Sequence, residues 1–103
     1  MIYLKVHSTD NGDMIAMCDE ALIDKVLSKG EIVIDIKGYS SFYKGDKVDK
    51  ETAVSRIRDL EHIYSANIVG TDSIDVALSA RIIDRKGILF VGDVPYAHSY
   101  SMD

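Results

Sequence analysis

The sequence predicts an α+β domain: a small, mainly antiparallel sheet that opens with a hairpin and carries about three helices on one face. Strand-like and helix-like patterns are interspersed along the 103 residues, and a hairpin signal stands at the start. No repeat, linker or low-complexity stretch divides the chain. Its length and its 47% apolar content suit a single globular domain over residues 1–103, built around one core.

The opening hairpin is predicted by alternation. Ile2, Leu4 and Val6 are separated by more polar residues, which is the period of a strand with one buried face. We expect a type I′ turn centred on Asn11-Gly12, because both central residues of that turn need positive φ. The segment 14–18 then returns as the antiparallel partner.

The next segment combines helix and strand signals. Asp19 is a suitable cap for a helix over 19–29, and Gly30 would end that helix. The strand predicted over 31–37 is rich in β-branched residues, which favours a central place in the sheet. The segment 38–47 breaks the period and is predicted to be an irregular loop with exposed aromatic side chains.

The second half of the chain predicts further helices. Asp49 is expected to cap a second helix that ends near Tyr64, with apolar side chains on one face. The run 66–70 is interpreted as a short helical turn that a glycine closes. A third helix should follow, capped by Thr71 or Asp72 and reaching about residue 84. Such a helix start can bind an anion, but a carboxylate at the cap makes ordinary capping the better interpretation.

The end of the chain is expected to be a last strand at 88–91 followed by a segment with proline. Pro95 cannot donate a hydrogen bond to a strand ladder. The chain beyond Gly92 is therefore predicted to be an edge strand or an ordered tail.

Composition predicts a cytoplasmic protein without a membrane span. No apolar run approaches the 18 residues that a membrane helix needs, and no signal peptide pattern opens the chain. Cys18 is the single cysteine and precedes two acidic residues, which disfavour a thiolate, so we expect a structural role for it. The three histidines lack the spacing of zinc ligands, and no nucleotide or hydrolase motif is present. We therefore expect no metal and no cofactor.

Charge and aromatic residues predict one candidate binding surface. The net charge is −5, yet residues 37–58 carry six basic against three acidic residues. Aromatic and basic side chains interleave there, a pattern suited to stacking on bases and contacting phosphates of RNA. Lys44 and Lys47 are the expected phosphate contacts, and Phe42 or Tyr43 the stacking or packing anchor. We also expect at least one of these two aromatic side chains to fold back and cover the sheet.

A second candidate surface joins Asn67 to the segment 94–98. Both stand at the ends of predicted elements, where binding groups are often mounted, so we expect them to meet in space. If the segment with Pro95 is extended, Tyr96 and His98 share one face. That face could meet a partner protein or pack inward.

Several blocks, taken together in order and spacing, resemble the archaeal domain of unknown function family 424. They are Met17-Cys18-Asp19-Glu20, Phe42-Tyr43-Lys44-Gly45, Ala66-Asn67-Ile68-Val69-Gly70 and Val91-Gly92-Asp93-Val94-Pro95-Tyr96-Ala97-His98. The family pattern favours histidine directly after the proline, where this chain has Tyr96. The resemblance implies an archaeal cytoplasmic protein without an established activity, associated with RNA or the translation machinery.

Three classes of function therefore stay open. A module that binds RNA or a ribonucleoprotein through residues 39–58 is the favoured one. A protein-interaction subunit would present the aromatic C-terminal segment. An enzyme, the least favoured class, would need a pocket between Asn67 and His98.

Overall fold

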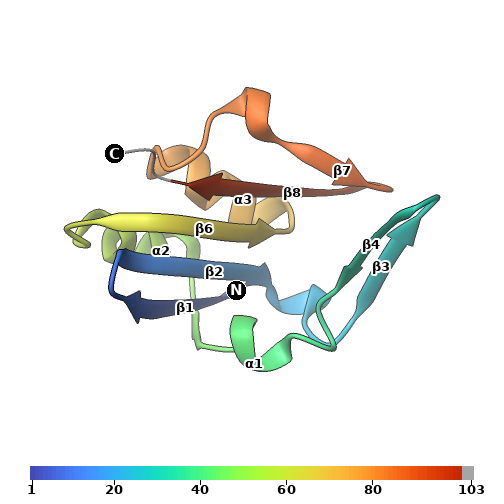
Figure 1. Ribbon diagram of the computed structural model, residues 1–103, viewed down its shortest axis with the longest axis horizontal. Coiled ribbons are helices and arrows are strands. Elements are labelled where there is room, and N and C mark those ends of the chain that lie inside the picture. Colours follow the sequence, from blue (N-terminus) through green and yellow to red (C-terminus); the bar gives the residue numbers. More distant parts are fainter. Residues whose placement is uncertain (101–103) are drawn as a thin grey trace.

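The structure is a computed structural model, and residues 1–100 are described (Figure 1). A mixed six-stranded sheet has the order β5-β1-β2-β6-β8-β7, and β3 and β4 form a separate two-stranded ribbon. Within the large sheet only β2 and β6 are parallel. The predicted α+β class with a mainly antiparallel sheet is confirmed, and the one parallel pair makes the sheet mixed. In chain order the elements are β1 (Ile2–Thr9), β2 (Gly12–Asp19), the 3-10 turn η1 (Glu20–Leu22), β3 (Val26–Lys29), β4 (Ile32–Asp35), α1 (Ser40–Tyr43), β5 (Asp46–Val48), α2 (Lys50–Arg58), β6 (Ile63–Val69), α3 (Thr71–Ser79), the 3-10 turn η2 (Arg85–Gly87), β7 (Leu89–Val91) and β8 (Val94–Tyr100).

The opening hairpin of β1 and β2 is confirmed, but its turn lies one residue earlier than predicted. Thr9 pairs with Gly12, so Asp10 and Asn11 are the central residues. Of the turn residues Asp10, Asn11 and Gly12, only Gly12 has positive φ, at 130°, and the type I′ assignment is therefore wrong. The Thr9 hydroxyl accepts a hydrogen bond from the Asn11 N–H at 3.1 Å and donates to the Gly12 carbonyl at 2.6 Å. These two bonds hold the turn in its observed form.

The predicted helix over 19–29 is wrong. One 3-10 turn, η1, leads into the ribbon of β3 and β4, whose turn is Gly30-Glu31 with Gly30 at a φ of 61°. Leu22 from η1 and Leu27 from β3, which suggested a helical face, instead pack on a second core cluster, which contains Ala16, Cys18 and Val69 of the sheet. Tertiary burial overrides the helical spacing here, since a short segment can place the same side chains inward as a ribbon.

The strand predicted over 31–37 is confirmed for Ile32–Asp35, but its central position is wrong. Within residues 1–100, β4 pairs only with β3, and Val33 is 62% exposed. The β-branched density of this strand reflects a ribbon, not a sheet centre. The ribbon stands at the end of the sheet toward which β2, β6 and β7 run (Figure 1).

The predicted loop over 38–47 contains α1 and the start of β5, and the side chain of Tyr43 is buried. The cap of α2 is confirmed, because the Asp49 carboxylate accepts a hydrogen bond from the Thr52 N–H at 2.7 Å. The helix ends at Arg58 and not near Tyr64, and β6 begins at Ile63.

The helical turn predicted over 66–70 is also wrong, because this run is the second half of β6. The strand lies between β2 and β8 and is covered on both faces, with Ala66, Ile68 and Val69 buried. A strand that is buried on both faces lacks the alternation that identifies strands in a sequence.

α3 begins where predicted but ends at Ser79, after which Arg81 takes a positive φ of 61°. β7 confirms the last predicted strand. β8 is neither an edge strand nor a tail, since it lies between β6 and β7. Pro95 fits there because it lies past Val69, the last residue of β6 that is paired with β8.

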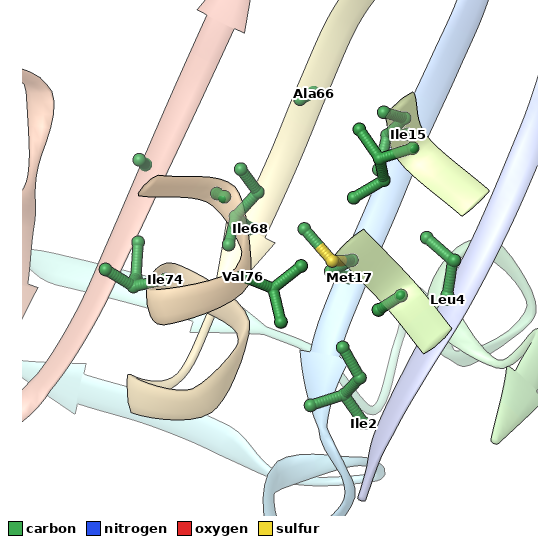
Figure 2. Packing of buried hydrophobic residues seen from close by; sticks show 12 residues of the cluster. Ile2, Leu4, Ile15, Met17, Ala66, Ile68, Ile74 and Val76 are labelled. Carbon is green, nitrogen blue, oxygen red and sulfur yellow. The ribbon is translucent and has the colours of Figure 1, made fainter. Parts of the chain in front are cut away.

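Two clusters of buried side chains lie on opposite faces of the sheet. Helices α2 and α3 cover one face, where Ile2, Met17 and Ile68 from the strands meet Val76 from α3 (Figure 2). On the other face, α1 and the β3–β4 ribbon cover a smaller cluster that includes Cys18. Packing of all helices on one face is thus correct for α2 and α3 and wrong for α1. Within residues 1–100 no helix has the length and apolar character to cross a bilayer.

Candidate functional site

A groove of about 550 Å³ lies between β4, α1 and the sheet face opposite to α2 and α3. We call it the β4 groove. All four residues of β4 line it, whereas none of β3 does. Its lining residues are Ile32, Val33, Ile34, Asp35, Tyr39, Phe42, Tyr43, Asn67, Tyr96 and His98.

The floor of the β4 groove comes from the paired strands β6 and β8. Asn67 is the pairing partner of His98, and Val69 is that of Tyr96, so these side chains share one face. The rings of Tyr96 and His98 lie edge to face with centroids 6.2 Å apart. The predicted meeting of Asn67 with the segment 94–98 is confirmed, although Asn67 lies within a strand and not at a turn. Pro95 is buried on the opposite face, outside the groove.

The α1 wall is held by two side chains of β1. The last carbonyls of a helix have no partner inside it. The carbonyl oxygen of Ser41 accepts a hydrogen bond from the Lys5 ammonium at 2.6 Å, and that of Phe42 accepts one from Nε2 of His7 at 3.0 Å. The His7 ring also stacks on Phe42, with centroids 4.8 Å apart and an interplanar angle of 11°. Burial raises the pKa of Tyr43 to about 12, so its hydroxyl stays protonated at neutral pH.

The opposite wall and the rim are apolar and exposed. Val33 is 62% exposed, and Tyr39, at the start of α1, is 64% exposed. Sequence reasoning missed the contribution of β4, because its β-branched residues suggested a central strand. It also missed the support from His7. The alternation of β1 was the available signal, since it places Lys5 and His7 on the face opposite to the main core.

The structure does not bring Lys44 and Lys47 into the β4 groove. Lys47 lies on β5 and pairs with Glu20 at 3.0 Å, and this hydrogen bond and charge raise the pKa of Lys47. Lys44 is exposed after α1. Other cations of the basic stretch also have acidic or carbonyl partners: Lys50 with Asp72 and Asp75, Arg56 with Asp46, and Arg58 with the carbonyl of Ser79. Four of the six basic side chains of residues 37–58 thus have acidic or carbonyl partners.

The start of α3 is occupied by a carboxylate from another element. Asp19, at the end of β2, accepts hydrogen bonds from the Ser73 N–H and hydroxyl, each at 2.8 Å, and from the Asp72 N–H at 3.2 Å. Capping of α3 is therefore confirmed, but the prediction that Thr71 or Asp72 supplies the cap is wrong. Any anion at this helix start would have to displace the Asp19 carboxylate.

Cys18, Asp35 and His98 are potentially reactive side chains in or near the β4 groove. Cys18 is fully buried, and burial followed by the charge of Asp19 raises its pKa to about 12, so the thiol is neutral. One oxygen of Asp35 accepts a hydrogen bond from the Gly38 N–H at 2.7 Å. Among residues 1–100, no side-chain hydrogen bond joins His98 to another group, and no three potential metal ligands converge. An apolar groove with a few polar groups is a typical binding site.

These features define a small α+β protein with a mixed sheet and a groove lined by aromatic and aliphatic side chains. The chain belongs to the family described as "Protein of unknown function (DUF424)", whose model matches residues 6–102. The family resemblance seen in the sequence blocks is thereby confirmed.

A solved structure shares the fold: the crystal structure of an uncharacterized conserved protein from Methanopyrus kandleri. It has a TM-score of 0.80 and 24% sequence identity, and the match covers 96% of this chain and 90% of that one. No curated protein matches the chain.

Proposed function

We propose that this protein is a binding module that recognises a segment of another protein in the β4 groove. The main support for the proposal is that exposed apolar side chains gather around the β4 groove. Of nine exposed large apolar residues in the described part of the chain, six lie on the groove rim or on the neighbouring strands β3 and β7. These six are Val26, Ile32, Val33, Tyr39, Leu89 and Phe90. Apolar side chains gathered around a groove are typical of a protein interaction site.

Electrostatics favour a protein partner over RNA. RNA binding relies on lysine and arginine side chains that contact phosphates, and none lines the β4 groove. Lys47, one of the two predicted phosphate contacts, is paired with Glu20. The exposed aliphatic side chains Ile32 and Val33 would offer little to a phosphate backbone. The aromatic floor alone would suit either partner, so an RNA-binding or translation-associated module is the competing outcome of the test.

The test selects peptides from a random library displayed on phage, with the purified protein as bait. The affinity of a selected peptide is then measured for wild type, for Val33→Glu in the groove, and for Val6→Glu. Val6 is a matched control, because it is also an exposed valine but lies on β1, away from the groove. We expect wild type and Val6→Glu to bind equally and Val33→Glu to lose at least tenfold in affinity. Equal affinity for all three proteins, or a failure to select any peptide, would overturn the proposal.

A parallel arm uses a pool of random single-stranded RNA at low salt. If the proposed function is right, no RNA binding that depends on Lys44 and Lys47 will be detected. If RNA binds, weakens steeply with salt and is lost when both lysines are replaced by glutamate, the RNA-binding module takes the place of the proposed function. Such a double substitution changes stability little, because exposed ion pairs contribute little to folding.

A further inference from the structure

We infer that the β4 groove takes its partner as an extended strand that pairs with the free edge of β4. This inference rests on the proposed function and specifies how the partner segment is held. Within the described residues, β4 has a pairing partner on one side only, namely β3. The groove runs along the other side, because every residue of β4 lines it and no residue of β3 does.

The backbone of β4 presents unused hydrogen-bonding groups to the groove. Lys29 and Ile32 are paired across the two-residue turn Gly30-Glu31, and the residues that flank such a turn form a hydrogen-bonded pair. Bonded pairs alternate along an antiparallel ladder, so the next such pair is Leu27 and Ile34. The N–H and C=O groups of Val33 and Asp35 must then point away from β3. In residues 1–100 they take part in none of the backbone hydrogen bonds found outside the ladders and helices.

The walls and floor of the β4 groove indicate which kinds of side chain the partner strand would carry. Successive side chains of a strand alternate in direction, so every second one would point at the floor formed by Asn67, Tyr96 and His98. Tyr96 and the apolar rim suit aliphatic or aromatic side chains at these positions. Asp35 is the only acidic residue in the lining, and no lysine or arginine balances it there. The partner is therefore an extended segment with alternating apolar side chains and a basic residue level with Asp35.

The edge of β4 differs in character from the edge of β5. β5 is an outer strand of the large sheet, and its Asp46 and Lys47 form ion pairs with Arg56 and Glu20. Charged side chains on an edge strand discourage pairing with another chain. β4 has the opposite character, since three of its four residues are aliphatic. Of these two edges, the one beside the groove is the one left open to a partner strand.

The first experiment uses the peptide selected on the wild-type protein, with its backbone amides N-methylated one at a time. Strand addition predicts an alternating pattern: methylation at every second residue weakens binding about tenfold or more, and methylation between them has little effect. A pattern without alternation, while Val33→Glu still abolishes binding, overturns strand addition and leaves the proposed function standing. If no peptide binds wild type, strand addition and the proposed function are both refuted.

The second experiment alters the protein. Val33→Pro removes the N–H that points into the groove but no hydrogen bond to β3, whereas Val33→Thr keeps both the N–H and the β-branched shape. We expect binding of the selected peptide to be lost in the proline variant and retained in the threonine variant. Amide exchange by NMR on the wild type adds a measurement that no folding defect can affect. Slower exchange at Val33 and Asp35 on peptide binding supports the inference, and unchanged exchange at both overturns it.

Discussion

Replacing Asp19 by alanine should destabilise the protein more than any other change to an acidic side chain that we consider. The Asp19 carboxylate holds the end of β2 to the start of α3 through three hydrogen bonds, at 2.8, 2.8 and 3.2 Å. Loss of an N-cap costs about 1 kcal/mol. Ser73 is fully buried, and leaving its hydroxyl without a partner adds about 1 to 3 kcal/mol. We therefore expect Asp19→Ala to lower the free energy of unfolding by about 3 kcal/mol.

Two further variants separate the contributions. Asp19→Asn keeps an oxygen that can accept from Ser73 but removes the negative charge at the helix start, so it should lose about 1 kcal/mol. Ser73→Ala removes the hydroxyl donor. The double variant with Asp19→Ala completes a double-mutant cycle. The losses in free energy of unfolding of the two single variants should sum to more than the loss in the double variant. That difference measures the bond between the two side chains.

Urea and thermal unfolding, followed by circular dichroism, provide the measurement. In a domain of this size each kcal/mol shifts the midpoint of thermal unfolding by about 4–8 °C, so Asp19→Ala should melt at least 10 °C below wild type. Glu20→Ala is the control, because this neighbour is exposed and its side chain forms a surface ion pair with Lys47, which contributes little to stability. If Asp19→Ala is no less stable than Glu20→Ala, the tie between β2 and α3 does not hold the fold as argued.

Three other predictions concern buried or strained positions. Cys18 should react with an alkylating reagent at neutral pH only after unfolding, and Cys18→Ala should leave binding intact; rapid modification of the native protein would contradict this. Burial raises the pKa of Cys18 from 9.0, and that of Tyr43 from 10.0, to about 12. The unfolded chain therefore loses these protons first, and stability should fall as the pH rises from about 9 to 12, by up to about 1.4 kcal/mol per pH unit for each group, with a smaller slope in Cys18→Ala. Gly12→Val should cost about 1 kcal/mol or more through its positive φ, and more again because a Cβ at Gly12 would overlap the His62 ring; urea unfolding equal to wild type would refute this.

Local signals predicted those parts of the fold that depend on neighbours in the sequence. The alternation of β1 identified a strand with one buried face, and Asp49 with the apolar face behind it identified α2. Both elements satisfy their hydrogen bonds within a few residues or with the adjacent strand. The candidate site was found in part for a different reason, because Asn67 and the segment 94–98 were both expected at the ends of elements, although Asn67 lies inside β6. Asn67, Tyr96 and His98 were placed together, although their role in binding stays a prediction.

The parts that were missed depend on residues far away in the chain. Asp19 was assigned to a local helix, but its carboxylate caps α3, which begins more than 50 residues later. β6 was interpreted as a helical turn because both of its faces are covered, which removes alternation. Segment 19–29 has helical spacing, yet its apolar side chains reach the second core cluster from a 3-10 turn and a ribbon. No window of the sequence carries this information.

The amino-acid sequence by itself determined the α+β class, the first hairpin, the cap of α2 and the membership of the family, because alternation, capping and motif blocks are properties of short segments. Only the tertiary structure decided that β2 and β6 run parallel, that β8 is an inner strand, and that β4 stands apart with one edge unpaired. These features arise when distant segments compete for the same buried surface. The β4 groove likewise depends on segments that are far apart in the chain, since its walls and floor come from β4, α1, β6 and β8.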